Sequence, residues 1–268
     1  MLAAEKPDAV VMAVPPHATG STASLVLERG IPLLIEKPPG LTPAELRGMI
    51  AAAQRGGTSA QVAFNRHYMP VMVRAREILD AEFPSDSVGR IDYEMTRFNR
   101  WDPDFSTTAI HALDGALFLA RSPFRTAELS FQSQRQGDRE AMNVVVSAEC
   151  VSAWRVLVII QPVAGRNAES AEIHAVGQSL MVKPPISPQS QANGALEHWR
   201  DDGLVASFSD SASDAVERLG VLGETRAFLG AVRSGTGFRP QLESCHQQVA
   251  LMEAIRLRQS GPIRFAPD

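Results

Sequence analysis

The alternation of strand-like and helix-like segments in the first 65 residues is the feature that most constrains the fold. Residues 8–14, 31–36 and 59–65 are short apolar runs, and a helix-like pattern separates each from the next. Continuous apolar runs are typical of parallel strands covered on both faces. Because crossovers between parallel strands are right-handed, this β-α-β-α-β order predicts a parallel sheet with helices on its faces.

The second helix of this series has clear sequence signals at both ends. Thr42 is the predicted N-cap, Pro43 takes the first helical position, and Glu45 completes a predicted capping box. Gly56 and Gly57 then end the helix.

The sequence pattern changes after residue 65. Long strand candidates follow with no convincing helix between them, so antiparallel pairing is expected; they are residues 126–135, 142–150, 153–161 and 170–184. Helices are predicted at residues 69–83, 107–120 and 214–233, and from a capping box at Ser244 and Gln247 onward. Residues 183–203 are expected to form a surface loop or lid.

These patterns predict an α/β plus α+β protein. Residues 1–65 are expected to form a truncated, parallel, Rossmann-like piece, that is, a partial dinucleotide-binding domain. Residues 66–268 are expected to form an α+β domain for substrate binding and oligomerisation, with an open, mostly antiparallel sheet flanked by helices.

Composition excludes several classes of function. The formal net charge is −4 and no basic stripe is interleaved with aromatic residues, which argues against nucleic-acid binding. No apolar run approaches the roughly 20 residues that cross a bilayer, and the N-terminus does not resemble a secretory signal. Cys150 and Cys245 are read as free thiols of a cytoplasmic protein. The six histidines lack metal-ligand spacing, so no metal site is expected.

Polar residues gather where the three predicted parallel strands end. Open parallel sheets bind their ligands beyond these carboxyl ends, so the residues there are candidates for a site. They are Pro15, Pro16 and His17 after the first strand, Glu36, Lys37 and Pro38 after the second, and Asn65, Arg66 and His67 after the third.

Several stretches together resemble the Gfo/Idh/MocA oxidoreductases, named after glucose–fructose oxidoreductase and inositol dehydrogenase. They are PDAVVMAVPPHATG, LERGIPLLIEKPPGLT, QVAFNRHYMP, TTAIHALDGALFL and FRPQLES, in matching order along nearly the whole chain. The resemblance implies hydride transfer between a carbon of a small sugar-like or polyol substrate and NAD or NADP. It also implies a homo-oligomer formed through the antiparallel sheet.

The resemblance also implies roles for individual residues. Lys37 would hydrogen-bond the reacting hydroxyl, and His111, with Asp114 one helical turn later, would act as general acid and base. Arg66 would contact nicotinamide or substrate. The cofactor would lie against Val14, Pro15, His17, Glu36, Lys37 and Asn65. Arg97, Asn99 and Trp101 either line a sugar pocket or form an exposed strand end.

Two departures from the family pattern leave alternatives open. No G-x-G-x-x-G turn precedes the first strand, which corresponds to the fourth strand of a dinucleotide fold. Thr107 stands where the family has an aspartate four residues before the histidine. The chain is therefore expected to be an oxidoreductase, a non-catalytic sugar-binding or oligomerisation scaffold, or a fragment whose start was assigned too late.

Overall fold

The computed structural model describes residues 2–84, 89–186, 193–210 and 214–266, which fold into two compact units. Unit 1 comprises Met1–Phe64 and Leu222–Glu253, and unit 2 comprises Asn65–Val221 and Ala254–Asp268. The predicted domains are defined by expected roles, and they remain a prediction. In space, residues 222–253 lie with the first unit.

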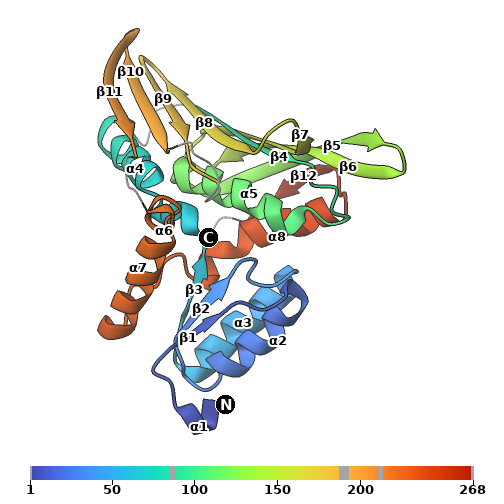
Figure 1. Cartoon of the computed structure of the whole chain (residues 1–268), viewed down its shortest axis with the longest axis vertical. Helices are drawn as coiled ribbons and strands as arrows, with labels where there is room; N and C mark the ends of the chain where they lie inside the picture. The colour runs from blue at the N-terminus through green and yellow to red at the C-terminus, as the bar shows by residue number, and fades with distance from the viewer. Residues whose placement is uncertain (1, 85–88, 187–192, 211–213, 267–268) are drawn as a thin grey trace. The chain divides into compact units, whose positions relative to one another are not determined.

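Unit 1 contains the predicted parallel sheet, in the order β1-β2-β3 (Figure 1). Its register pairs Val11 with Leu34 and Leu34 with Gln61, and both pairings are parallel, as the sequence predicted. Helices α2 and α3 pack against each other beside the sheet (Figure 1). The elements are α1 (Leu2–Glu5), β1 (Val10–Met12), α2 (Pro16–Leu27), β2 (Leu33–Glu36), α3 (Pro43–Gly56) and β3 (Ala60–Ala63).

The start of α3 confirms part of the predicted capping box and corrects the rest. The Thr42 hydroxyl accepts a hydrogen bond from the Glu45 amide at 3.1 Å, as an N-cap does. The Glu45 carboxylate accepts from the Leu41 amide at 2.7 Å, one residue before the position expected of a capping box. The turn between Lys37 and α3 is therefore anchored to the helix by two hydrogen bonds.

The C-terminal segment of unit 1 covers the outer edge of β3. Helix α7 (Val221–Ser234) adds Phe228 and Ala231 to a buried cluster with Leu34 and Ala63. The Pro240 carbonyl accepts a hydrogen bond from the Val62 amide at 2.9 Å. Unit 1 thus combines the first 64 residues with a helix that lies more than 150 residues later in the chain.

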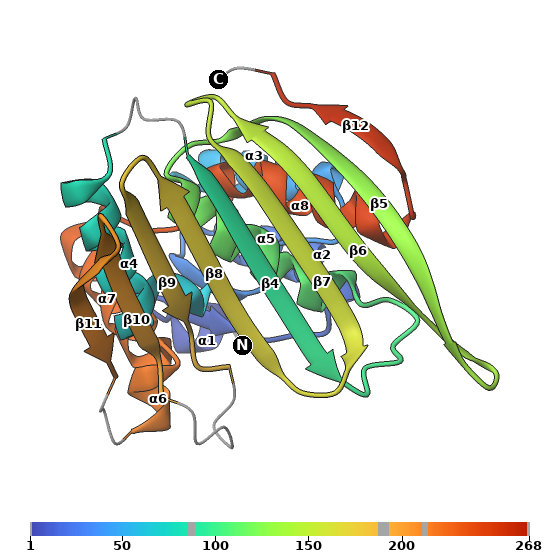
Figure 2. The ribbon, with the colours of Figure 1, turned by 90° about the horizontal axis from the view of Figure 1, so that it is seen from above.

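Unit 2 is built on a nine-stranded sheet with the order β11-β10-β9-β8-β4-β7-β6-β5-β12 (Figure 2). The β4–β7 pair is parallel and all other pairs are antiparallel, which confirms the predicted mostly antiparallel sheet. The strands are β4 (Arg90–Phe98), β5 (Phe124–Gln136), β6 (Arg139–Cys150), β7 (Arg155–Ala164), β8 (Ala168–Ala175), β9 (Gln178–Lys183), β10 (Ala195–Arg200), β11 (Gly203–Ser209) and β12 (Gly261–Arg264).

Helices cover one face of this sheet and leave the other face open (Figure 2). Helix α4 (Pro70–Glu82) packs on β9 and β10, and α5 (Ser106–Ala120) packs on β4 and β7. Ile91, Tyr93 and Met95 of β4 are buried beneath the helices. Asp92 and Glu94 alternate with them and lie on the open face. Among the described residues, no helix has both the length and the apolar character needed to cross a membrane.

Two predicted segments have a different structure from the one expected. The strand candidate at residues 170–184 is a hairpin of β8 and β9, because the chain reverses at Val176 and Gly177. Within the predicted lid at residues 183–203, residues 195–200 form strand β10, and residues 187–192 lie outside the described residues.

The C-terminal helices also begin differently from the prediction. The helix expected at 214–233 is divided into α6 (Ala215–Arg218) and α7 at Gly220, where φ is +76° and a side chain would meet the backbone. The predicted capping box with Gln247 remains a prediction, and the Ser244 hydroxyl donates to the Gln241 carbonyl at 2.8 Å. It lies in the 3₁₀ turn η2 (Leu242–Cys245), which precedes α8 (His246–Arg256).

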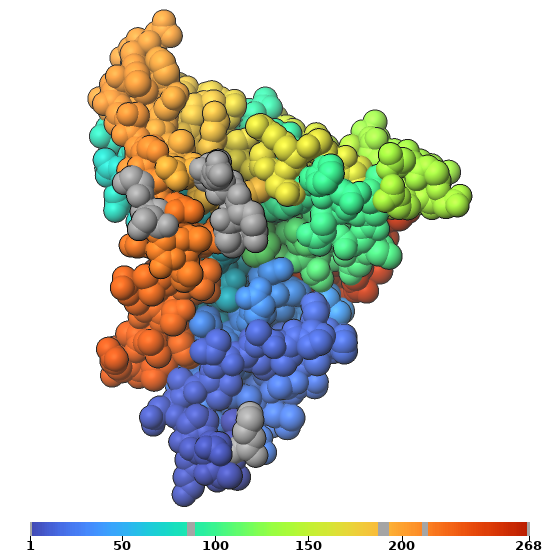
Figure 3. Space-filling view, viewed as in Figure 1, coloured from blue at the N-terminus to red at the C-terminus, as the bar shows by residue number. Residues whose placement is uncertain are grey.

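The hairpin of β5 and β6 extends beyond the strands beside it. Its two strands pair from Phe124 to Gln136, whereas β7 pairs with β6 only from Val144 onward. The distal part of the hairpin consequently forms a lobe of its own in the space-filling view (Figure 3).

A glycine in α5 permits close packing against the sheet. A Cβ atom on Gly115 would lie 2.8 Å from the Tyr93 hydroxyl, so Gly115→Ala is expected to destabilise unit 2 by about 1–3 kcal/mol through overpacking. Denaturation followed by tryptophan fluorescence measures this, since all three tryptophans lie in unit 2. Gly48→Ala is the control, because nothing lies within 4 Å of its added methyl group. Equal fluorescence midpoints for the two variants would contradict the packing account.

Candidate functional site

The predicted site residues of unit 1 lie at the carboxyl ends of β1 and β2. Strand β2 ends at Glu36, and the half-buried Lys37 follows directly. Beyond it, Pro38, Pro39 and Gly40 are buried, and the Lys37–Pro38 peptide is cis. The buried turn holds the Lys37 backbone in place while its side chain keeps access to solvent.

Burial and charge act in opposite directions on Glu36. Its partial burial raises the pKa of the carboxyl from its ordinary value, while the positive charge of Lys37 lowers it. Burial has the larger effect, so the pKa of Glu36 is raised.

The carboxyl end of β1 presents an uncapped helix N-terminus. Helix α2 begins at Pro16, and its N-cap residue, Pro15, makes no side-chain capping bond. Pro15 and His17 are exposed, and Val14 is half-buried. Pro15 and Pro16 carry no N–H, and the Ala18 amide donates to the Pro15 carbonyl at 2.8 Å, so the His17 amide is the first-turn donor that faces a ligand.

In unit 2, helix α5 carries His111 and Asp114, and the structure shows a partner for Asp114 that the sequence analysis missed. The buried Asp114 carboxylate lies 3.1 Å (Oδ1) and 3.0 Å (Oδ2) from Nε2 of His67. The His67 ring also packs on Phe118, with ring centroids 4.3 Å apart. His67 lies in the 3₁₀ turn η1 (Asn65–Tyr68), so this pair joins α5 to the turn that follows β3. His111 itself is half-buried.

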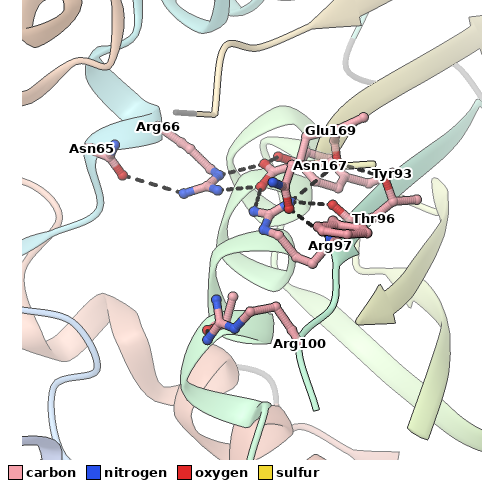
Figure 4. A network of polar contacts seen from close by, with 11 residues as sticks. Asn65, Arg66, Tyr93, Thr96, Arg97, Arg100, Asn167 and Glu169 are labelled. Atoms are coloured by element: carbon pink, nitrogen blue, oxygen red, sulfur yellow. Dashed lines mark hydrogen bonds and ion pairs between the residues drawn. The ribbon is translucent and has the colours of Figure 1, made fainter. Parts of the chain in front are cut away.

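A buried ionic cluster joins the same turn to the sheet (Figure 4). Arg66 donates from Nε to Oε2 of Glu169 at 2.8 Å and from Nη2 to Oε1 at 2.5 Å. Arg97 donates to the same Oε1, and the Tyr93 hydroxyl donates to Oε2 at 2.7 Å. One carboxylate therefore binds two guanidinium groups and a phenol in the interior of unit 2.

The charges of the cluster determine its ionisation. Burial alone would raise the pKa of Glu169, but the charges and hydrogen bonds of Arg66 and Arg97 outweigh burial and lower it to about 2. Burial, together with the charge of Glu169, raises the pKa of Tyr93 well above its ordinary value. At neutral pH the cluster thus holds two guanidinium cations, one carboxylate and a neutral phenol.

The loop between β4 and α5 holds the remaining predicted substrate contacts. Asn99 has a positive φ of 56°, and its Oδ1 accepts a hydrogen bond from the Trp101 indole at 2.9 Å. Arg100 pairs with Asp102 at 2.7 Å and donates to the Thr108 hydroxyl of α5 at 3.4 Å. The loop is therefore ordered by its own side chains and anchored to the helix that carries His111.

Other predicted residues have structural partners. Asn65 donates to the Leu219 carbonyl at 2.8 Å and thereby holds the start of η1. Arg66, predicted to contact nicotinamide or substrate, is 4% exposed and directs its Nε and Nη2 groups to Glu169.

The sequence analysis missed Glu169 and Tyr93, and it placed His67 at the strand ends without its partner Asp114. A signal for Glu169 exists, because period-two alternation places it on the same face of β8 as the buried Ala171 and Ile173. A glutamate whose side chain points to the buried face of a sheet requires a buried cation to compensate its charge.

Comparison with known proteins agrees with the fold. Residues 1–64 match the GFO_IDH_MocA family, described as an oxidoreductase family with an NAD-binding Rossmann fold. Residues 1–64 are thus similar to the Gfo/Idh/MocA oxidoreductases, and two curated proteins match longer parts of the chain. This confirms the resemblance identified from the sequence.

Individual relatives are distant. The rhizopine catabolism protein MocA of Rhizobium meliloti is 28% identical over 44% of this chain and 36% of its own length. Inositol 2-dehydrogenase of Gluconacetobacter diazotrophicus is 24% identical over 74% of this chain and 64% of its own length. The chain thus covers less than two thirds of either protein. The structure of a levoglucosan dehydrogenase in complex with NADH and levoglucosan superposes with a TM-score of 0.79 at 16% identity, covering 97% of this chain and 81% of that one.

The buried cluster makes the stability of unit 2 dependent on Glu169. Glu169→Gln leaves two buried guanidinium groups without their carboxylate. We therefore expect the free energy of unfolding of unit 2 to fall by about 3–5 kcal/mol at neutral pH. The pKa of Glu169 is lowered from 4.5 to about 2, so its stabilising effect is complete above the unfolded-state pKa. It disappears as the pH falls through about 2. The difference in unfolding free energy between the parent and the variant should therefore shrink as the pH falls from 4.5 toward about 2.

Tryptophan-monitored denaturation at several pH values measures both effects. Glu172→Gln is the matched control, because Glu172 lies on the same strand but is exposed on the other face. It should change stability by no more than about 0.5 kcal/mol. A Glu169→Gln variant as stable as Glu172→Gln would refute the assigned role.

Proposed function

We propose that this chain is an NAD(P)-dependent oxidoreductase that acts on a sugar, polyol or related hydroxy compound by hydride transfer. The observation that carries the proposal is the family match over residues 1–64, together with Lys37 at the end of a parallel strand. A distant relative named inositol 2-dehydrogenase and the similar fold of a levoglucosan dehydrogenase support this substrate class.

The strand ends of unit 1 are compatible with a nicotinamide group. The His17 amide in the first turn of α2 offers one donor to a carboxamide or ribose, and Val14 and Pro15 offer apolar surface to a ring. His17, Glu36, Lys37 and Asn65 complete the proposed contacts. A nicotinamide held by these residues would supply the acceptor for a hydride from the substrate carbon.

Lys37 and His111 have the chemistry for the remaining steps. As the carbon of the substrate is oxidised, its hydroxyl loses a proton and negative charge develops on the oxygen. The ammonium group of Lys37 would donate a hydrogen bond to that oxygen and stabilise the charge. His111 would accept the hydroxyl proton as general base and return it in the reverse reaction.

The remaining predicted residues would position the substrate. Asp114 pairs with His67, so its proposed role is to fix the middle of α5 against η1. Arg66 and Arg97 would position the substrate indirectly, because they hold the Glu169 cluster together. Trp101 and Asn99 would offer an aromatic face and a polar group to a sugar.

Replacement of Lys37 tests the proposed chemistry. Lys37→Met should lower turnover of polyols with NAD or NADP by about 10²–10⁴-fold, because the developing oxyanion loses its donor. Nicotinamide fluorescence during NADH or NADPH titration should change much less. Lys6→Met, an exposed lysine of the same unit, is the control.

The outcome separates this proposal from a scaffold role. Turnover that Lys37→Met leaves unchanged would remove Lys37 from the mechanism. A chain that binds sugars but shows no nicotinamide binding at any concentration would favour the non-catalytic scaffold instead.

We also propose that two copies associate through the open face of the sheet. Val145, Leu157 and Ile159 are half-buried apolar residues in neighbouring positions of β6 and β7 on that face. Apolar side chains adjacent on an uncovered face favour a second copy as a cover.

A charge at the centre of this face should disrupt association. Ile159→Asp is expected to shift the molar mass measured by light scattering toward that of the monomer, because a carboxylate would become desolvated in the interface. Val176→Asp, in the 92% exposed turn between β8 and β9, should leave the mass unchanged. A monomeric parent protein would contradict the proposal.

A further inference from the structure

A cavity of about 490 Å³ lies at one end of the sheet of unit 2, and Glu169 of the buried cluster is among its lining residues. Strands β4 and β9 end there, and β8 and β10 begin there. This volume falls within the range typical of small-molecule sites. The cavity is lined by side chains from all four strands and from the turn between β7 and β8.

The cavity opens on the face of the sheet that the helices leave uncovered. Glu94 and Thr96 line it, and they alternate along β4 with Tyr93, Met95 and Arg97, which are buried on the helix-covered face. Helix α5, which carries His111, packs on that opposite face. The cavity is therefore separated by the sheet from the proposed acid–base residue.

Positive charge lies directly behind the cavity wall. Arg97 donates from Nη1 to the carbonyls of Thr96 at 2.8 Å and Ala168 at 3.3 Å, and Thr96 and Ala168 both line the cavity (Figure 4). The cluster to which Arg97 belongs holds two guanidinium groups against one carboxylate, Glu169. It therefore has one positive charge in excess, and Coulomb interactions through a dry wall are screened less than those in water.

The wall itself carries two more cations. Arg166 and Lys183 line the cavity, and within the described ranges neither forms an ion pair. The acidic lining residues are Glu94, exposed on the same face, and Glu169, whose charge is already counted in the cluster with its two guanidinium groups. The wall and the cluster behind it are thus cationic, although the chain has a formal net charge of −4. This local reversal of sign favours an anion.

Neutral polar groups of the wall suit hydroxyl groups. Asn167 uses its Oδ1 to accept a hydrogen bond from the Phe98 amide at 2.9 Å, which leaves its amino group as a donor. The Thr96 hydroxyl donates to the Ala168 carbonyl at 3.4 Å and keeps its lone pairs as acceptors. Ser170 adds another hydroxyl to the wall.

We propose that this cavity binds a small polyhydroxylated anion, that is, a sugar-sized molecule bearing one carboxylate or phosphate group. Arg166 and Lys183 bind the anionic group, and Thr96, Asn167 and Ser170 bind hydroxyls. The site stands independently of the proposed hydride transfer, because no residue assigned to that chemistry contributes a binding contact.

Calorimetric titration of the full chain without nicotinamide tests the proposal. The ligands are gluconate, glucose 6-phosphate, neutral glucose and inorganic phosphate. At least one of the two sugar anions should bind about tenfold or more tightly than both glucose and phosphate. Affinity should also fall as salt is added. The tighter of the two sugar anions identifies the preferred anionic group.

Paired charge variants locate the binding. The double variant Arg166→Gln, Lys183→Gln should bind the preferred anion with an affinity about tenfold or more lower than that of the parent. Arg155→Gln with Lys6→Gln changes the net charge equally at exposed positions that do not line the cavity, and should leave the affinity unchanged.

Three results would overturn the proposal. The first is that neither sugar anion binds with a Kd below roughly 10 mM. The second is that glucose or phosphate binds as tightly as the sugar anions, and the third is that both double variants lose affinity equally. Because none of these measurements uses nicotinamide or turnover, failure here leaves the oxidoreductase proposal standing, and the reverse also holds.

Discussion

The carboxylate of Glu169 is the interaction on which the interior of unit 2 depends. It binds Arg66 of the turn after β3, Arg97 at the end of β4 and the Tyr93 phenol under α5. Within the part of the chain that the structure describes, these two buried guanidinium groups have no other carboxylate partner, so their charges would be uncompensated without Glu169. One side chain on β8 therefore fixes the turn η1 and the place where β4 turns toward α5 within unit 2. Gly115 allows α5 to approach Tyr93 closely enough for this arrangement.

The cluster also connects the two faces of the sheet. Its excess positive charge is buried on the helix-covered side, while the backbone carbonyls bound by Arg97 belong to residues that line the cavity on the open side. A structural ion cluster and an anion site are thus two consequences of one arrangement of charges. Because the chain as a whole is acidic, the excess of cations at this end of the sheet is a local feature.

Much of the fold could be predicted because its signals are local. The apolar runs that became β1–β3 and the Thr42 cap are short-range patterns, and the structure confirms them. The hairpin within residues 170–184 was missed because Val176 and Gly177 reverse the chain without interrupting its strand-like composition. The partners of buried charges were missed for another reason: His67 pairs with Asp114 across 47 residues, and Arg66 pairs with Glu169 across 103. No spacing rule reaches that far.

Hydride transfer to nicotinamide is the central claim, and a deuterium label tests it most directly. The chain would be incubated with NAD or NADP and polyols deuterated at their hydroxyl-bearing carbons, and the nicotinamide would be analysed by mass spectrometry. The account predicts reduced nicotinamide that carries one deuterium from the substrate carbon, in the parent chain and not in Lys37→Met. Oxidised substrate without deuterium in the nicotinamide, or no transfer from any polyol, would contradict it.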